Sequence, residues 1–436
     1  MASTCPVPPA SSLLADSITP RLHYILTGTF NTLFLYLLAF SPYSPNGPTL
    51  TIQRRVRGEG PHQFIALNEE RDRAYVTTWA QPPSLSSWEV LEGGRGGVRK
   101  INTVPISATG SYLTVSPSSL PFPSRVYQAG GPVAQTFSLS PSTRGFDAQL
   151  QEVIYLDGAE EELWDEKTDR TRVALRYGSH AVDIDPVRGR AYVPHVGRDS
   201  IFVYSFNEDG TLNHLAEVPT HGQQGHEGVR HSIPSRDGGR LYVVTEHTSY
   251  LDIYATHSSA PYLSHTARYS VIPPSLDPTR HLYRGDTLRL SHDGRRLYVT
   301  TRGKTGEQKG WVSVFEVDEK GDVRVKGEEK EGVRYGALSR FEARNSGGKA
   351  HAIEVFPFHP SSPSSSSAAG EGHDYLVFTD DEAGHVSILE WRDEWNELRE
   401  VAVVRLGEDA PAEGEEKGEV LEGERGTGAS HAVWLS

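Results

Sequence analysis

Cysteine, long apolar runs and early basic residues are scarce in this sequence. Cys5 is the only cysteine, so no intrachain disulfide can form, which disfavours a disulfide-stapled secreted protein. The most apolar run, Leu33 to Phe40, is far shorter than the ~20 residues of a membrane helix. No Lys or Arg precedes Arg21, so a secretory signal peptide is not supported. We therefore expect a soluble, cytoplasmic protein without a membrane partner.

Positive charge is also in short supply. The sequence has 57 Asp and Glu against 43 Lys and Arg, a formal net charge of −14. This balance argues against a nucleic-acid partner, because phosphate binding requires a basic face. Part of the acidic excess lies in an expected insertion at 408–428, and a Ser-rich insertion is expected at 360–372. Residues 1–20 are expected to be a flexible tail, and 21–436 a single domain.

Motifs for cofactor and metal chemistry are missing as well. His226 and His231 are five residues apart, not the four of a zinc-protease helix. The "GKT" at 303–305 lacks the upstream Gly of a phosphate loop, and no G-x-S-x-G elbow occurs. We therefore expect neither a metal nor a cofactor.

A repeated unit supplies the positive signal. A turn followed by a short apolar strand recurs at 68–79, 185–196, 235–246 and 291–302, with weaker copies at 108–115 and 373–381. The runs are β-branched or aromatic and bounded by Asp, Gly and Pro, which is typical of antiparallel strands. A third strand usually follows, and a fourth completes the unit. Four strands every ~40 to 50 residues indicate the blades of a β-propeller.

The two ends of the chain supply one further blade. Residues 430–436 match a first strand, whereas 22–30, 32–40 and 50–57 match strands two, three and four. A blade shared between the ends hides both sheet edges, which otherwise invite aggregation. Together with six internal blades, this predicts an all-β, seven-bladed propeller closed by pairing of its N- and C-terminal strands.

The repeat gathers distant residues at one end of the central channel. Tyr75, Tyr192, Tyr242 and Tyr298 recur in phase and are expected in the blade cores. Strand one opens twelve residues before such a Tyr, and strand two ends about four residues after it. Antiparallel pairing places both points on the same face. The residues predicted there are His62, His180, Arg230, Glu246, Asp286, Arg302, His351 and His431, with Arg284 just ahead of its strand.

These residues allow a structural and a functional interpretation. A polar residue at the start of a strand is often only a turn cap, and Glu246 and Arg230 could form an ion pair alone. Several Arg in one funnel of an acidic protein nevertheless point to an anionic ligand. Arg binds a carboxylate through two parallel hydrogen bonds, and His carries protons near neutral pH.

The chain also resembles a known family. The stretches "SHAVDIDPVRGRAYV" (179–193), "GVRHSIPSRDGGRLYVVTE" (228–246) and "RGDTLRLSHDGRRLYVTTR" (284–302) are similar to the fungal carboxy-cis,cis-muconate cyclases. These 3-carboxymuconate lactonizing enzymes are seven-bladed propellers. The resemblance is specific over about 178–406 and 428–436, weaker over 22–80 and poor over 81–177.

The resemblance implies a reversible, cofactor-free lactonisation in aromatic-acid catabolism by the β-ketoadipate route. One carboxylate of 3-carboxy-cis,cis-muconate adds across a C=C bond of the same molecule. The functional residues of the family fall on His180, Glu246, Arg230 and Arg302. His180 would move the proton, Glu246 would orient or balance charge, and the two Arg would bind the substrate.

Two additional candidates and one departure complete this interpretation. Arg284 and His351 are further candidates for substrate binding. Where the family carries a basic segment near its second blade, residues 104–113 read "VPISATGSYL". The expected partner is a small anionic polycarboxylate.

Two other functions stay open. Related seven-bladed propellers hydrolyse sugar lactones, so a lactone hydrolase is the second enzymatic hypothesis. A non-catalytic interaction scaffold is the third, because propellers host many unrelated functions. A lactone panel separates the first two hypotheses, and a stoichiometric protein partner would favour the third. The sequence leaves a homo-oligomer open.

Overall fold

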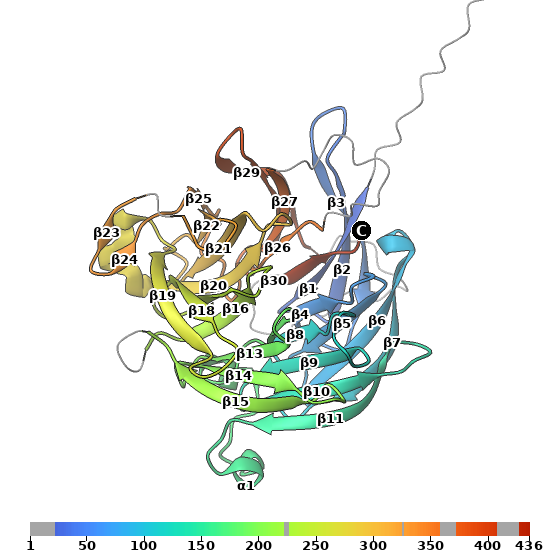
Figure 1. The fold of residues 1–436 in the computed structure, drawn as a ribbon. Helices are drawn as coiled ribbons and strands as arrows, with labels where there is room; N and C mark the ends of the chain where they lie inside the picture. Colours follow the sequence, from blue (N-terminus) through green and yellow to red (C-terminus); the bar gives the residue numbers. More distant parts are fainter. Residues whose placement is uncertain (1–21, 222–225, 325–326, 358–371, 408–426) are drawn as a thin grey trace, which may run out of the picture.

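Short β-branched and aromatic runs form antiparallel sheets arranged like the blades of a propeller (Figure 1). This computed structural model describes residues 22–221, 226–324, 327–357, 372–407 and 427–436. The predicted tail (1–20) and most of the predicted insertions at 360–372 and 408–428 lie outside these residues. Seven sheets form within the described part of the chain, so the predicted seven-bladed propeller is confirmed.

The closing blade contains both ends of the described chain, and three blades follow it. The closing blade holds β1 (His23–Thr29), β2 (Phe34–Ser41), β3 (Thr49–Arg57) and β30 (Ala429–Trp434). The next holds β4 (His62–Leu67), β5 (Arg73–Thr78), β6 (Ser84–Leu91) and β7 (Gly97–Pro105). Then come β8 (Tyr112–Val115), β9 (Arg125–Gly130), β10 (Val133–Leu139) and β11 (Phe146–Ile154). The fourth holds β12 (Asp183–Asp185), β13 (Arg190–His195), β14 (Ser200–Phe206) and β15 (Leu212–Pro219).

Three more blades complete the ring. The fifth holds β16 (Val229–Pro234), β17 (Arg240–Thr245), β18 (Tyr250–Thr256) and β19 (Leu263–Ser270). The sixth holds β20 (Tyr283–Leu290), β21 (Arg296–Gly303), β22 (Trp311–Glu316) and β25 (Ser339–Glu342). A small hairpin of β23 (Glu329–Lys330) and β24 (Val333–Arg334) adds to the fifth blade through β19. The seventh holds β26 (Ile353–Val355), β27 (His373–Thr379), β28 (His385–Arg392) and β29 (Glu397–Arg405).

Pairing of the chain ends closes the ring, as predicted. Strand β30 pairs antiparallel with β1, with Ile25 opposite Trp434 and Thr27 opposite Ala432. The Trp434 side chain is fully buried, and its indole N–H donates to the Glu354 carbonyl of the neighbouring blade (3.1 Å). Strand pairing therefore joins the two chain ends within the closing blade, and the Trp434 hydrogen bond joins this blade to the seventh.

The structure corrects the sequence-based prediction at two points. Residues 108–115 were expected to end in a second strand, but β8 pairs only with β9 and lies at the inner edge of its sheet. The second strand is β9, which carries its own buried Tyr127. Arg284 was expected just ahead of a strand, yet β20 begins at Tyr283 and includes it.

Helices are few and short. The connection between β11 and β12 holds α1 (Ala159–Leu163) and a 3-10 helix, η2 (Arg172–Arg176). The other 3-10 helices are η1 (Glu92–Gly94) and η3 (Pro274–Leu282). Among the described residues, none of these helices has the length and apolar character to cross a membrane. Residues 81–177 thus contribute regular blade strands and one connecting segment.

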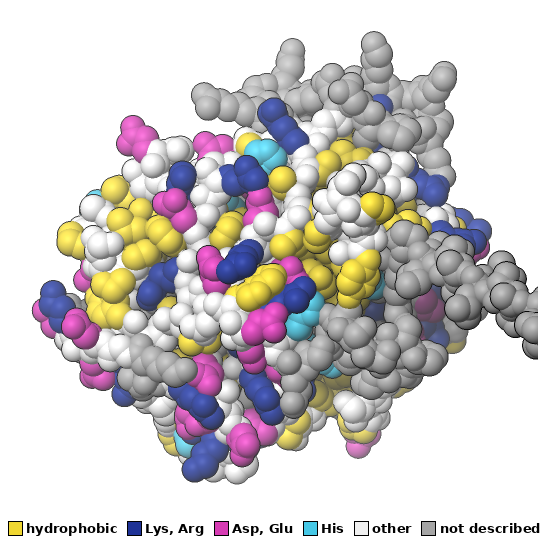
Figure 2. Space-filling model, turned by 90° about the horizontal axis from the view of Figure 1, so that it is seen from above, with side chains coloured by type: hydrophobic (Ala, Val, Ile, Leu, Met, Phe, Trp, Pro, Cys, Tyr) yellow, Lys and Arg dark blue, Asp and Glu magenta, His cyan; other side chains and the backbone are white. Residues whose placement is uncertain are grey.

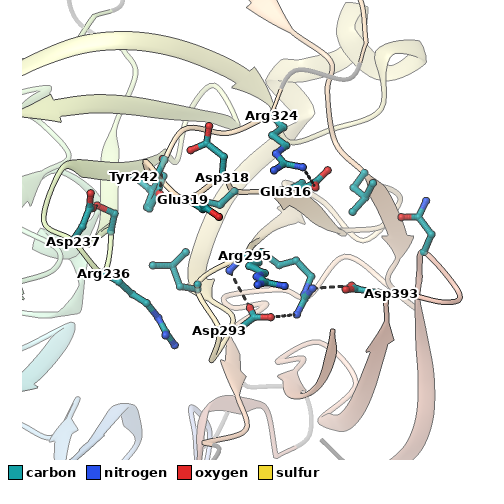
Figure 3. A pocket seen from close by; sticks show the side chains of 18 residues that line it. Arg236, Asp237, Tyr242, Asp293, Arg295, Glu316, Asp318, Glu319, Arg324 and Asp393 are labelled. Carbon is teal, nitrogen blue, oxygen red and sulfur yellow. Dashed lines mark hydrogen bonds and ion pairs between the residues drawn. The ribbon is translucent and has the colours of Figure 1, made fainter. Parts of the chain in front are cut away.

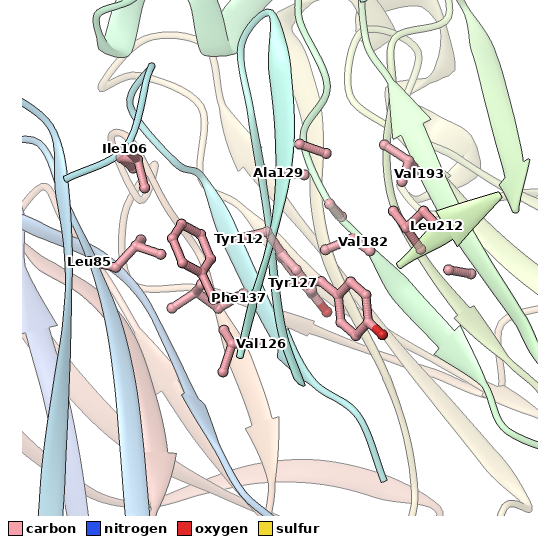
Figure 4. Close-up of a cluster of buried hydrophobic side chains, with 14 of the residues drawn as sticks. Leu85, Ile106, Tyr112, Val126, Tyr127, Ala129, Phe137, Val182, Val193 and Leu212 are labelled. Atoms are coloured by element: carbon pink, nitrogen blue, oxygen red, sulfur yellow. The ribbon is translucent and has the colours of Figure 1, made fainter. Parts of the chain in front are cut away.

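Neighbouring blades pack through buried aromatic and aliphatic side chains. One such cluster joins the blades β4–β7, β8–β11 and β12–β15, and it includes Tyr112, Tyr127, Phe137 and Val182 (Figure 4). The marker tyrosines are buried, as expected, and the hydroxyls of Tyr75, Tyr242 and Tyr298 reach the next blade. Tyr242, for example, donates to the Gly321 carbonyl (2.7 Å). This packing holds the inner strands, and the residues at their ends, in one ring.

Candidate active site

Backbone hydrogen bonds between blades position the predicted site residues. The His180 N–H donates to the Pro194 carbonyl (3.0 Å), and the His180 carbonyl accepts from the Ser111 hydroxyl of the preceding blade (2.7 Å). Glu246 directly follows β17, and its carbonyl accepts from the Gly285 N–H of the next blade (2.9 Å). The site is therefore built across blade boundaries on rigid strands.

Arg230, on β16, is the centre of a buried cluster. Its Nη1 lies 2.6 Å from Nε2 of His180 and donates to Oε2 of Glu246 (3.1 Å). Its Nη2 lies 2.7 Å from Oδ1 of Asp286. A guanidinium only donates, so Nε2 of His180 is the acceptor and the ring proton resides on Nδ1. Three residues far apart in sequence thus share one arginine.

Glu246 gathers the remaining arginines. Its Oε1 accepts from Nη1 of Arg284 (3.0 Å) and from Nη2 of Arg302 (3.0 Å). The Arg284 side chain is 30% exposed and that of Arg302 15%, whereas those of Arg230 and Glu246 are 9% and 6% exposed. Arg284 and Arg302 therefore form the open side of the cluster, where a ligand can reach them.

Asp286 is the second anion of the cluster. In addition to its contact with Arg230, its Oδ2 lies 4.0 Å from Nε of Arg302. The same oxygen accepts from the His351 backbone N–H (2.6 Å). Three arginines and two carboxylates give a formal charge of +1 when His180 is neutral. The cluster is thus neutralised enough to be buried and keeps a positive balance that favours an anionic ligand.

Burial and neighbouring charges set the protonation states. Burial, with Arg230 beside the ring, lowers the pKa of His180 from 6.5 to about 3, so the imidazole is neutral at neutral pH. Burial alone would raise the pKa of the Glu246 carboxyl, but Arg230 and Arg302 outweigh it and lower that pKa. The pKa of Asp286 is lowered for the same reasons. The free site therefore pairs a neutral base with fixed charges.

The other predicted histidines are placed differently. The His351 ring is fully buried, its Nδ1 lies 3.0 Å from the Thr301 carbonyl oxygen, and it joins the cluster through its backbone N–H. His62 and His431 are buried too, and His431 stacks on Phe64 with ring centroids 4.0 Å apart. The structure therefore brings together His180, Arg230, Glu246, Asp286, Arg284 and Arg302, while a substrate-binding role for His351 stays a prediction.

One buried neighbour was missed from the sequence. The His231 ring is 3% exposed, and its centroid lies 5.2 Å from that of His180. It directly follows Arg230 in β16, at a point where the pairing with β17 shifts register between Val229 and His231. Regular alternation of side chains therefore does not predict its position. Among the residues that the structure describes, no group of three His, Cys, Asp or Glu side chains could hold a metal ion.

A separate cavity lies at the far end of the same strands. It has a volume of about 540 Å³, and Ser235, which follows β16, lines it together with Arg236, Asp237 and Arg295 (Figure 3). The predicted site residues are absent from its described lining. Basic and acidic side chains alternate in this cavity, and Figure 2 shows both signs interspersed over one face of the molecule.

Comparison with known proteins agrees with this architecture. The chain is 26% identical over 376 residues to muconate cycloisomerase 1 of Cutaneotrichosporon cutaneum, covering 86% of this chain and 91% of that protein. It is 24% identical over 240 residues to carboxy-cis,cis-muconate cyclase of Neurospora crassa, covering 53% and 57%. The resemblance read from the sequence is thereby confirmed.

Solved structures and family membership complete the comparison. The periplasmic gluconolactonase of Pseudomonas aeruginosa matches with a TM-score of 0.65 and 16% identity, covering 95% of this chain and 99% of that one. At this identity the match shows the shared fold alone. Residues 36–337 match the family described as lactonase, 7-bladed beta-propeller. The chain therefore belongs to the lactonase family of seven-bladed β-propellers.

Proposed function

We propose that the chain is a cofactor-free intramolecular lyase that interconverts 3-carboxy-cis,cis-muconate, or a related unsaturated polycarboxylate, and its lactone. The observation that supports this most is the shared contact of Arg230 with His180 and Glu246, at 2.6 and 3.1 Å. This shared contact places His180, which can transfer a proton, beside the cluster of arginines that would bind an anion. Sequence relatives named muconate cycloisomerase and carboxymuconate cyclase support the same reaction.

The arginines would bind and orient the substrate. Arg284 and Arg302 lie on the open side and currently share one oxygen of Glu246. A substrate carboxylate can replace that oxygen, because a guanidinium offers more donors than one acceptor uses. Two carboxylates held by fixed cations would place the third over the C=C bond. This converts the addition into an oriented intramolecular step, a large part of the rate gain.

His180 would transfer the proton. In ring closure, a carboxylate oxygen forms a C–O bond, the π bond is consumed, and protonated His180 delivers H⁺ to the neighbouring carbon. In ring opening, neutral His180 takes that proton back while the C–O bond breaks. A bound polyanion raises the His180 pKa, because it draws Arg230 away from Nε2 and adds negative charge. Substrate binding would thus supply the acid that the free site lacks.

A diene absorbance assay tests this function. Wild-type protein should bleach the ultraviolet absorbance of 3-carboxy-cis,cis-muconate, and His180→Ala should lower the rate by about 10²–10⁴-fold, the usual contribution of general acid–base catalysis. His214→Ala is the matched control, because His214 is exposed on β15 and outside the cluster. No bleaching by wild type, or equal rates for His180→Ala and wild type, would refute the proposal.

Lactone hydrolysis is the second candidate. The family match favours it, and so does the neutral state of His180, since a neutral imidazole can activate water once Arg230 moves away from the Nε2 lone pair. Ring opening by water would release acid from a sugar lactone. A pH-indicator assay over a panel of sugar lactones, run on the same preparation, separates this function from cyclisation of the diene.

A further inference from the structure

Two aromatic residues occupy the position in their blades that Glu246 occupies in the fifth. The Glu246 N–H donates to the Gly228 carbonyl, in the loop just before strand one of its blade (2.6 Å). In the same way, the Trp79 N–H donates to the Pro61 carbonyl (2.7 Å), and the Phe30 N–H donates to the Gly428 carbonyl (2.8 Å). Each follows the second strand of its blade. Phe30 and Trp79 are therefore on the same face of the ring as Glu246.

These two rings contact each other and form what we term the aromatic wall (Phe30 and Trp79). Their centroids are 4.6 Å apart at an angle of 34°. Phe30 is 3% exposed, and Trp79 is half-buried. Propeller blades meet around one axis, so a wall from the closing blade and the β4–β7 blade stands across the channel mouth from the β16–β19 blade.

Each ring of the aromatic wall carries a cation. Nζ of Lys349 lies 5.5 Å from the Phe30 centroid, donates to Oδ1 of Asn31 (2.9 Å) and lies 3.9 Å from Oδ1 of Asp381. The guanidinium of Arg172 lies 5.0 Å from the Trp79 centroid. Both distances are within the range of a cation–π interaction. The aromatic wall therefore has one cation over each of its rings.

The wall connects to the candidate active site on both sides. On one side, Nη1 of Arg302 donates to the carbonyl of Gly348, the residue before Lys349 (3.2 Å). On the other side, the segment between β11 and β12 passes the β8–β11 blade, where Thr109 N–H donates to the Arg170 carbonyl (2.9 Å). That segment places Arg172 over Trp79 and, eight residues later, His180 beside Arg230.

We propose that Phe30, Trp79, Lys349 and Arg172 form a second half of the ligand site, which receives the flat unsaturated body and the distal carboxylate of a planar polycarboxylate. This inference rests on the proposed function for the identity of the reacting end. The flat body lies against the partly exposed Trp79 ring, which the buried Phe30 ring supports from behind, and the distal carboxylate pairs with Lys349 or Arg172. The substrate class is thereby narrowed to planar polyanions with carboxylates at both ends.

A non-reacting probe tests the site by calorimetry. Benzene-1,3,5-tricarboxylate is flat and carries three carboxylates, whereas cyclohexane-1,3,5-tricarboxylate has the same charge without a flat ring. Trp79→Leu should weaken binding of the flat probe by about tenfold, which is within the range for stacking on an aromatic side chain. The same substitution should weaken binding of the cyclohexane probe by less than about twofold. Lys349→Gln and Arg172→Gln should each weaken binding of both probes by about twofold to fivefold, as for a solvent-accessible cation and its anion.

The chain offers a matched control pair. The Arg399 guanidinium lies 4.4 Å from the centroid of Trp395 in the outer β28–β29 hairpin, away from the channel. Trp395→Leu and Arg399→Gln should leave both affinities unchanged. Equal weakening of the two probes by Trp79→Leu, unchanged affinity in the Trp79, Lys349 and Arg172 variants, or no binding by wild type would overturn the second half-site.

Failure of this inference and failure of the proposed reaction give different results. If wild type bleaches the diene but Trp79→Leu binds the flat probe normally, the second half-site is wrong and the reaction stands. If wild type binds the flat probe through Trp79 but does not bleach the diene, the reaction is wrong and the half-site stands. In an active protein, Lys349→Gln should raise KM for the tricarboxylate and leave kcat within about twofold, as expected for uniform binding.

Discussion

Glu246→Gln is the most informative single change in the cluster. The carboxylate accepts from Arg230, Arg284 and Arg302 at 3.0 to 3.1 Å, and its side chain is only 6% exposed. Removing its charge leaves three arginines with Asp286 as the one remaining anion of the cluster. Breaking a buried ion pair costs about 3–5 kcal/mol in the free energy of unfolding. We expect the lower end, about 3 kcal/mol, because water reaches Arg284 and screens part of the repulsion.

The pH dependence of this loss follows from the lowered pKa of Glu246. A carboxyl whose folded-state pKa lies below its ordinary 4.5 contributes stability that is present above about that pH. The contribution is lost as the pH falls through the folded-state pKa. The difference in unfolding free energy between wild type and Glu246→Gln should therefore be full at neutral pH and shrink below about pH 4.5. Urea unfolding at several pH values measures it.

The same substitution should strengthen ligand binding. The formal charge of the cluster rises from +1 to +2, so a tricarboxylate gains one favourable interaction. At ~10 Å and an effective dielectric constant of ~20, this is worth about 1.7 kcal/mol, or roughly twentyfold in affinity. Glu397→Gln, which removes an exposed partner of Arg399, is the control and should change stability by less than about 0.5 kcal/mol. Unchanged stability of Glu246→Gln, or weaker tricarboxylate binding, would refute this account of the cluster.

Three further predictions follow from the same contacts. In the lactone-opening direction, kcat/KM should not rise with pH between about pH 5 and 8, because the pKa of His180 in the free protein is about 3 rather than 6.5. A rise in kcat/KM with a midpoint near pH 6.5 would contradict the buried geometry of His180. Arg230→Lys should lower the rate of diene bleaching by about hundredfold, since one ammonium cannot contact His180, Glu246 and Asp286 together; full activity of this variant would exclude a shared guanidinium. Trp434→Ala should lower the free energy of unfolding by about 3–5 kcal/mol in urea denaturation, because the side chain is fully buried at the ring closure; a loss below about 1 kcal/mol would show that β30 contributes little to closure.

The fold was predictable because its signal repeats. Tyr75, Tyr192, Tyr242 and Tyr298 recur on second strands, and the chain ends divide one blade between them. The error at 108–115 has a local cause. That segment combines a Gly turn with a short apolar strand, which is the same local pattern as a second strand. Its place at the inner edge depends on pairing with β9, a tertiary choice that the pattern does not encode.

The sequence predicted where the candidate site lies, but it did not predict which side chains contact one another there. Counting along the repeat placed Glu246 and Arg302 at one end of the channel, and the structure joins them at 3.0 Å. Counting along the repeat could not assign the shared role of Arg230. That role depends on the side-chain conformations of residues from three neighbouring blades. The burial of His351 was also out of reach, since a polar residue at a strand start can face water or the core with the same sequence pattern.

The omission of the aromatic wall has a different origin. Trp79 stands four residues after Tyr75, the same offset that leads from Tyr242 to Glu246, so the count that found Glu246 also reaches Trp79. Trp79 carries no formal charge, so the clustering of charge that marks Glu246 gives no signal there. The buried Tyr maintains the blade core, while the residue four positions later faces the channel mouth. The described blades carry an anion (Glu246), a cation (Arg302) or an aromatic ring (Trp79) at that position around equally buried core tyrosines. Under the proposed half-site, these side chains together would set which ligand binds at the channel mouth.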